Sequence, residues 1–159
     1  MDKSRPSITG RARLKCYDKN GAFKFDTGWL YNTITNASLA EYSGLIGGVG
    51  TKTAFTYIAV GTDDTAESKT HTALQAEITD SGLARASVTP TQETTVVTDD
   101  TLQLYKEWTA SGSVSVEEIG IFNAASAGTM AGRKLTGIKA VTSGDKLQGT
   151  YQLIFAEKV

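Results

Sequence analysis

The chain has 159 residues, a formal net charge of −1 at pH 7 and a single cysteine. The near-neutral charge argues against a surface that binds nucleic acid without sequence preference, and one cysteine excludes an internal disulfide framework. No segment approaches the roughly 18 apolar residues of a membrane span, and the first residues lack the apolar run of a secretory signal. We therefore expect synthesis in a cytoplasm, with no membrane and no nucleic acid as partner.

The N-terminal segment is basic. Residues 1–9 show no apolar periodicity, and we expect a flexible arm there, ahead of a single domain over residues 10–159. Residues 11–17 alternate strictly between an apolar and a basic face, which predicts a half-buried strand. The apolar face holds Ala12, Leu14 and Cys16. The basic side chains that we expect to bind a partner, or else to form a solvated surface, are Lys3, Arg5, Arg11 and Arg13.

A β-hairpin is predicted over residues 11–26. Residues 18–21 include an Asn-Gly pair, which adopts a positive φ at little cost. Residues 22–26 then alternate again, with Phe23 and Phe25 on one face.

Two short helices are expected. The first begins at Thr35 or Asn36, or at a competing capping box over residues 38–41, and ends at Gly47-Gly48. Its apolar face, which should cover a sheet, is formed by Leu39, Tyr42 and Ile46. The second helix spans residues 70–78, with Leu74 and Ile78 as its apolar anchors.

The remaining periodic segments predict strands. They are rich in β-branched and aromatic residues, and they span residues 55–60, 83–89, 94–98, 101–110, 114–123, 130–141 and 146–155. With the hairpin, this gives about eight or nine short strands, so we expect a mainly β fold, an antiparallel β-sandwich with two short helices.

Residues 114–123 are expected to form the central strand. The alternation of apolar and polar residues breaks at Glu117-Glu118, and Gly120 follows. Glycine inside a strand marks a bend or a close backbone approach, which predicts a kink or bulge. Neighbouring strand residues point to opposite faces, so the two carboxylates are not expected to share a substrate.

Few residues suggest chemistry. Asp63, Asp64 and Glu67 could bind Ca²⁺ in a loop, but the ligand spacing of an EF-hand is missing. One histidine, His71, and one cysteine, Cys16, cannot build a catalytic triad or a zinc site. We expect no enzyme activity, no metal and no cofactor.

Several aromatic side chains could serve as a platform for sugar rings. Trp29 and Trp108 are the strongest candidates, although both lie in segments whose apolar residues are expected to form the core. A receptor- or glycan-binding module therefore remains an alternative function.

Five short motifs in the same order resemble small virion proteins of tailed bacteriophages, including the N-terminal modules of tail fibres. They are Thr35-Asn36-Ala37, Ala59-Val60-Gly61, residues 72–77 (TALQAE), residues 118–123 (EIGIFN) and residues 143–147 (SGDKL). The chain departs from a tail fibre in its extra hairpin over residues 11–26 and in the absence of a repetitive shaft.

The resemblance implies a virion structural protein, most simply a capsid decoration (cement) protein that binds and stabilises the assembled head. Its expected partners are the major capsid protein or tail subunits, and further copies of itself, with a trimer favoured. A small tail or baseplate adaptor or a fibre-attachment subunit is the alternative within the virion. In either case the expected location is the virion, which is assembled in the host cytoplasm.

Overall fold

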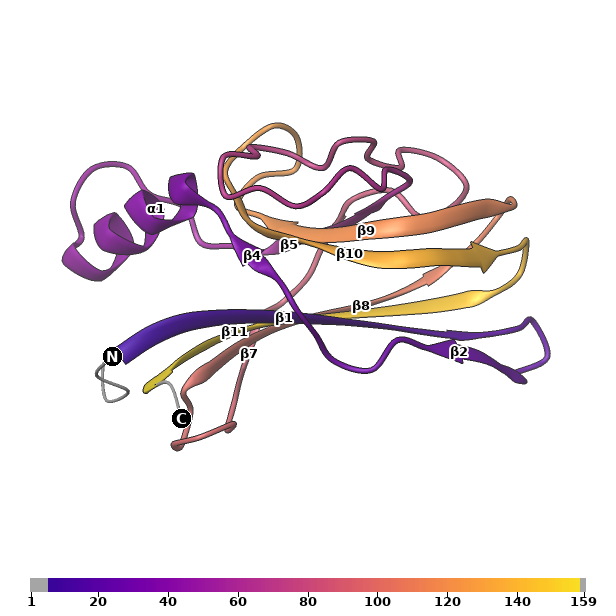
Figure 1. Ribbon diagram of the computed structural model, residues 1–159, viewed down its shortest axis with the longest axis horizontal. Helices are drawn as coiled ribbons and strands as arrows, with labels where there is room; N and C mark the ends of the chain where they lie inside the picture. Colours follow the sequence, from indigo (N-terminus) through magenta and orange to yellow (C-terminus); the bar gives the residue numbers. More distant parts are fainter. Residues whose placement is uncertain (1–5, 158–159) are drawn as a thin grey trace.

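Two antiparallel β-sheets pack face to face as a sandwich (Figure 1). The structure, a computed structural model, describes residues 6–157. Within these residues the chain forms eleven strands and one α-helix. The expected mainly β sandwich is confirmed. The strand number exceeds the prediction because three short strands, at Leu30–Tyr31, Thr33–Ile34 and Thr91–Glu93, were not predicted, whereas the strand predicted at residues 94–98 is absent.

Sheet A contains six strands in the order β2-β1-β11-β8-β7, with β3 also paired to β1. Their bounds are β1 (Pro6–Tyr17), β2 (Phe23–Asp26), β3 (Leu30–Tyr31), β7 (Thr91–Glu93), β8 (Thr101–Thr109) and β11 (Lys146–Glu157). The predicted β1–β2 hairpin is present, and its turn contains Gly21 at φ 84°.

Sheet B contains five strands in the order β4-β10-β9-β5-β6. Their bounds are β4 (Thr33–Ile34), β5 (Tyr57–Gly61), β6 (Ala86–Ser87), β9 (Val114–Phe122) and β10 (Met130–Val141). The chain passes from sheet A to sheet B at Asn32, between β3 and β4.

The hydrophobic core fills the space between the sheets. Ala12, Leu14 and Cys16, the predicted apolar face of β1, are each 0% exposed and belong to this core. Because side chains alternate between the two faces along a strand, Arg11 and Arg13 lie on the outer face of sheet A.

Strand β9 is the central strand of sheet B, as predicted. Its alternation breaks at the two glutamates, because Val116 and Ile119 both join the core. The register shifts lie on the partner strand, between Met130 and Gly132 and between Leu135 and Lys139 of β10. A Cβ at Gly120 would lie 3.0 Å from the Gly132 carbonyl oxygen, so this glycine permits a close backbone approach.

The helix α1 (Asn36–Gly47) begins and ends as predicted. Thr35 is the N-cap and accepts a hydrogen bond from the Ser38 N–H, and Gly48 in the left-handed conformation ends the helix. The predicted covering face was correct at Tyr42 and wrong at Leu39 and Ile46. The buried helix residues are Ser38, Tyr42 and Gly44, whereas Leu39 and Ile46 are 50% and 83% exposed.

The second predicted helix was wrong. Residues 70–78 form turns and an isolated bridge between Gly61 and Glu77, without helical structure. Leu74 and Ile78 are nevertheless buried, so the apolar anchors were correct but their periodicity was not helical. The physical reason is a hydrogen-bond acceptor from a distant part of the same chain: the Glu118 side chain accepts hydrogen bonds from the Gln75 and Ala76 N–H groups.

Two other segments differ from the prediction. Residues 94–98 form a turn in the β7–β8 loop, because the Asp100 carboxylate accepts the backbone N–H groups of Thr95, Val96 and Val97. The strand predicted at residues 83–89 is reduced to β6. The expected arm, residues 1–9, overlaps β1 from Pro6 onward, and residues 1–5 lie outside the described part of the chain.

Candidate functional site

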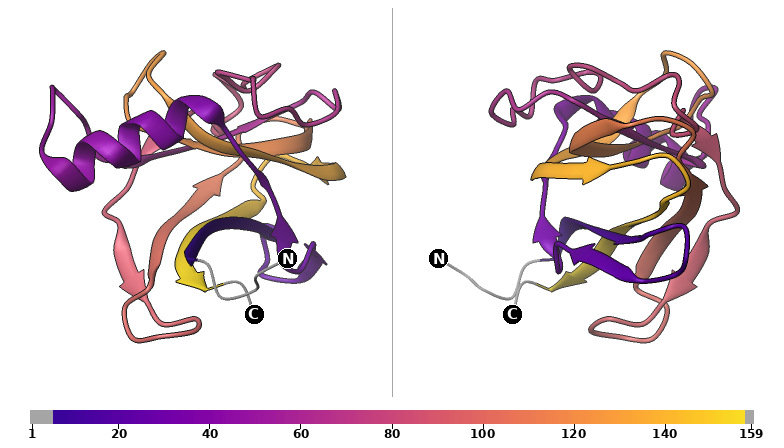
Figure 2. Two further views of the ribbon diagram at one scale, coloured as in Figure 1. Left: turned by 60° about the vertical axis from the view of Figure 1, so that its left-hand side comes forward. Right: turned by 90° about the vertical axis from the view of Figure 1, so that its right-hand side faces the viewer.

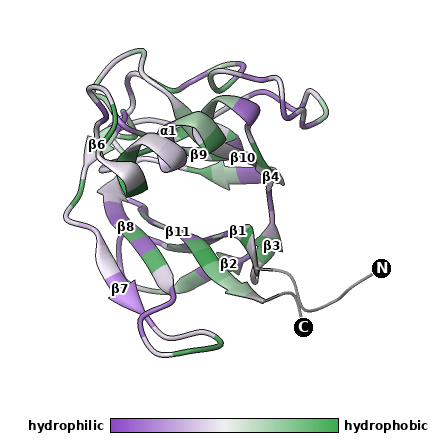
Figure 3. Cartoon of the chain, turned by 90° about the vertical axis from the view of Figure 1, so that its left-hand side faces the viewer, coloured by the Kyte–Doolittle hydropathy of each residue, from purple (hydrophilic) through white to green (hydrophobic). Residues whose placement is uncertain are grey.

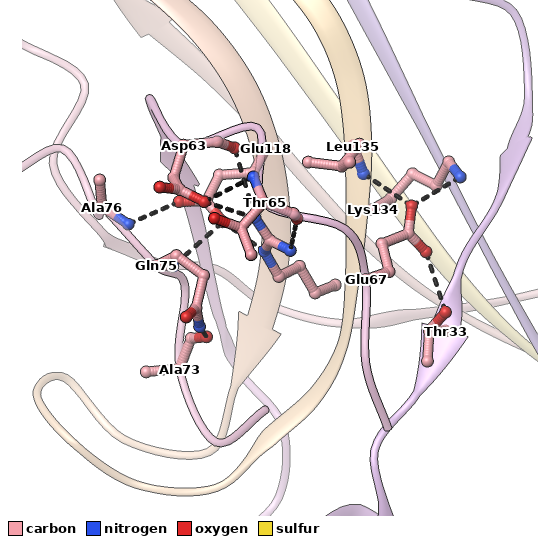
Figure 4. Close-up of polar contacts among 11 residues, drawn as sticks. Thr33, Asp63, Thr65, Glu67, Ala73, Gln75, Ala76, Glu118, Lys134 and Leu135 are labelled. Carbon is pink, nitrogen blue, oxygen red and sulfur yellow. Dashed lines mark hydrogen bonds and ion pairs between the residues drawn. The ribbon is translucent and has the colours of Figure 1, made fainter. Parts of the chain in front are cut away.

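The most buried charges belong to an ion pair on sheet B. The Arg133 Nε donates to Glu118 Oε2, and the two side chains are 1% and 0% exposed. The rest of the guanidinium donates to the carbonyl oxygens of Thr65 and Asp63 and to the Asp63 carboxylate. Figure 4 shows these contacts converging from the strand and the overlying loop. This network holds the loop onto the sheet.

The acidic loop residues have structural roles. Glu67 accepts hydrogen bonds from the Thr33 hydroxyl, the Lys134 ammonium group and the Leu135 N–H (Figure 4). Asp63 accepts the Thr65 N–H, which lowers the pKa of its carboxyl group. In residues 6–157 no three His, Cys, Asp or Glu side chains gather in a group that could bind a metal ion.

The single thiol is in the core. Cys16 is 0% exposed, and its burial raises the pKa of the thiol to about 11. A thiolate is the reactive form of cysteine, so this pKa disfavours a role in catalysis at neutral pH.

Two of the four basic residues predicted to bind a partner lie side by side on sheet A. The Arg11 Cζ lies 4.3 Å from the centroid of the Trp29 ring, and the Arg13 Cζ lies 5.9 Å from it. Arg13 is further engaged in a two-point ion pair with Asp26. Lys3 and Arg5 lie outside the described residues.

A chain of hydrogen bonds, here called the polar ladder, crosses sheet A on its outer face. Arg11 Nε donates to Gln152 Oε1 (2.7 Å), Gln152 Nε2 donates to Gln103 Oε1 (2.7 Å), and Gln103 Nε2 donates to Glu93 Oε1 (3.1 Å). The four side chains come from β1, β11, β8 and β7. The ladder fixes the Arg11 side chain through Nε and leaves its two terminal nitrogens without a hydrogen-bond partner among the described residues.

Arg11 also lines a surface pocket, here called the Arg11 pocket, with a volume of about 540 Å³. Its aliphatic wall is formed by Ile8, Ile34, Val96, Ile154 and Ala156. Its other side chains are those of Thr9, Arg11, Tyr31, Asn32 and Thr95. Among these described lining residues, Arg11 alone is charged at neutral pH. The sequence predicted Arg11 as a binding residue but gave no signal for the pocket, which is assembled from four separate segments.

Asn32 is the second unusual polar group of the pocket. Its amide oxygen and nitrogen are buried and have no hydrogen-bond partner in the described part of the chain. The amide lies between two glycines: a Cβ at Gly10 would be 1.9 Å from its oxygen, and one at Gly132 would be 2.3 Å from its nitrogen. The Tyr151 hydroxyl, also buried without a partner there, would lie 2.4 Å from the same Gly132 Cβ.

The two tryptophans have different surroundings. Trp108 is 4% exposed and donates its indole N–H to the Ala84 carbonyl oxygen, so it belongs to the core and cannot stack on a sugar. Trp29 is half-buried beneath the arginines. The aromatic side chain most open to solvent near the pocket is Tyr31, which is 64% exposed.

One end of the sandwich presents apolar side chains to solvent. The helix α1 stands out from this end (Figure 2), and parts of its ribbon are coloured as hydrophobic in Figure 3. We call Leu39, Leu45, Ile46 and Val49 the α1 patch; they are 50%, 39%, 83% and 69% exposed. Leu39 and Ile46 are seven residues apart and therefore share one face of the helix.

In comparisons with protein-family models, with curated proteins and with solved structures, no match to this chain was found. Of the helices in the described residues, none has the length and apolar character needed to cross a membrane.

Proposed function

We propose that this protein is a non-enzymatic structural subunit of a tailed-bacteriophage particle, and that it decorates the assembled head and stabilises it. The proposal starts from the resemblance of five sequence motifs to phage virion proteins. The structural feature that supports it is the α1 patch, because a helix that directs its large aliphatic side chains to solvent is suited to contact with another protein.

The composition of α1 supports an intermolecular role. The helix contacts its own domain through two small residues, Ser38 and Gly44, and through Tyr42. Its larger aliphatic side chains stay 39–83% exposed after folding, so their burial against a neighbour would contribute further, up to roughly 1.5–3 kcal/mol for a side chain as exposed as Ile46. A decoration protein that binds only assembled capsid subunits stabilises the shell by mass action.

In this proposal, copies of the chain associate, with a trimer as the expected stoichiometry, and sit where capsid subunits meet. The major capsid protein is the partner, and no substrate or cofactor is involved. A tail or baseplate adaptor is the competing position within the virion.

Binding to isolated heads that lack the protein tests this role. We expect the wild-type protein to saturate many sites over the shell by cryo-electron microscopy, and to be trimeric by light scattering. Ile46→Asp should abolish head occupancy without lowering the melting temperature, because Ile46 is already exposed to water.

Ile138→Asp is the matched control, because Ile138 is 70% exposed but lies on β10, outside the α1 patch. Equal occupancy for both variants would remove α1 from the contact surface. A ring of copies confined to the tail would exclude decoration and establish the adaptor instead.

A further inference from the structure

We propose that the Arg11 pocket binds an acidic saccharide, meaning a sugar ring that carries a carboxylate. This inference is independent of the role in capsid decoration. It rests on one oriented guanidinium, an exposed tyrosine ring and an amide without a partner, all of which line the same pocket.

The guanidinium is held in position before any ligand arrives. Its Nε is engaged by Gln152 at 2.7 Å, and its plane is supported by the Trp29 ring at 4.3 Å. Among the described residues, the terminal nitrogens have no hydrogen-bond partner. Two parallel N–H groups match the two oxygens of a carboxylate, so Arg11 selects a planar anion over a neutral group.

The walls of the pocket fit a pyranose ring. Such a ring has an apolar face of C–H groups and a rim of hydroxyl groups. Tyr31 supplies an aromatic surface, Ile154 and Val96 supply aliphatic contacts, and the Thr9 and Thr95 hydroxyls can donate or accept hydrogen bonds. The volume of about 540 Å³ lies within the range typical of small-ligand sites.

Asn32 gives independent support for a polar ligand. Buried amide groups nearly always have hydrogen-bond partners, and the described protein atoms supply none to this one. Gly10 and Gly132 leave space for the amide and hold it at the crossing between the sheets. Both amide atoms are buried, so they would bond to a ligand hydroxyl only after the side chain turned toward the pocket.

A bound peptide is less compatible with this pocket. Extended peptides are recognised mainly through main-chain hydrogen bonds to an open strand edge. Here the edge of β1 is occupied from Gly10 to Ala12, because the Asn32 N–H donates to the Gly10 carbonyl oxygen and β3 pairs with Arg11 and Ala12. A peptide could therefore add to this edge only over the short part of β1 before Gly10.

The test is a glycan array that contains matched pairs of saccharides with and without a carboxylate, such as sialyllactose with lactose and oligogalacturonate with its methyl ester. Affinities of the bound members are then measured by calorimetry. We expect only the acidic member of a pair to bind.

Arg11→Gln should weaken that binding by about tenfold or more, because it removes the charged guanidinium group and its two terminal N–H donors. Arg13→Gln is the control, since Arg13 lies on the same strand and face but outside the pocket lining. Tyr31→Ala should also weaken binding, and at 64% exposure its loss cannot unfold the protein. The proposal is overturned if no acidic glycan binds, if both members of a pair bind equally, or if Arg11→Gln and Arg13→Gln weaken binding equally. Binding of an acidic peptide to the pocket, with no binding of the acidic saccharides, would also overturn it.

Discussion

Glu118 and Arg133 face each other from adjacent strands and form an ion pair whose side chains are 0% and 1% exposed. Each partner also fixes the long loop over sheet B, Glu118 through the Gln75 and Ala76 N–H groups and Arg133 through two carbonyl oxygens. The pair thus connects the central strand to a segment that has almost no regular structure of its own.

Removal of one partner should be far more destabilising than removal of both. Glu118→Leu leaves the buried Arg133 charge with only the partly exposed Asp63 carboxylate as an anion, and we expect the free energy of unfolding to fall by about 3–5 kcal/mol. The double variant Glu118→Leu/Arg133→Met should lose less than the sum of the single changes. Urea denaturation of the four proteins measures this coupling, and strictly additive losses would show that the ion pair is unimportant.

Gly10 is predicted to be intolerant of any side chain. A Cβ there would lie 1.9 Å from the Asn32 amide oxygen, so Gly10→Ala should lower the free energy of unfolding by about 1–3 kcal/mol. Shortening the neighbour in Gly10→Ala/Asn32→Ala should restore most of that loss. Gly47→Ala, at the exposed end of α1, is the control and should be neutral or slightly stabilising. A stable Gly10→Ala single variant would contradict the close approach.

Cys16 should report on opening of the core. Burial raises the pKa of its thiol to about 11, and its sulfur is inaccessible between the sheets. In native buffer at pH 8 we expect a disulfide reagent to react only as fast as the protein unfolds, and to react at once in guanidinium chloride. Immediate reaction of the folded protein would place the thiol at the surface.

The Arg13–Asp26 pair should contribute to stability in a defined pH range. Hydrogen bonds from Arg13 lower the pKa of the Asp26 carboxyl from 3.8 to about 2, so the folded state favours its ionised form. The stabilisation is therefore complete above pH 4 and is lost as the pH falls towards 2. Its size should be about 1 kcal/mol or less, because the pair is partly exposed. Carbon-detected NMR titration should show this pKa returning to its ordinary value in Arg13→Gln; an unchanged pKa would exclude Arg13 as the cause.

Strand β1 could be predicted because its alternation is strict: Ala12, Leu14 and Cys16 lie on one side, and Arg11 and Arg13 on the other. The cap of α1 could also be predicted, since Thr35 acts locally. The buried face of α1 could not, because it includes the small residues Ser38, which donates to the Thr35 carbonyl oxygen, and Gly44, which the Lys52 side chain covers.

The remaining errors have long-range causes. Residues 70–78 have helical spacing, but Glu118, more than forty positions away, binds their backbone N–H groups in another conformation. Residues 94–98 have strand composition, but Asp100 binds three successive N–H groups and makes a turn. The Arg11 pocket likewise depends on segments that meet only in the folded protein.

The pairing of β1 with β11 has a consequence for the timing of folding. These two strands pair in register from Pro6–Glu157 to Tyr17–Lys146 and occupy the middle of sheet A. A nascent chain therefore emerges with β1, β2 and β3 long before the strand that completes their sheet. Loop closure over such a distance slows folding, and the apolar face of β1 stays exposed until synthesis of β11. We expect sheet A to form only after β11 has left the ribosome. Binding of chaperones to the exposed apolar face of β1 should be strongest just before that step.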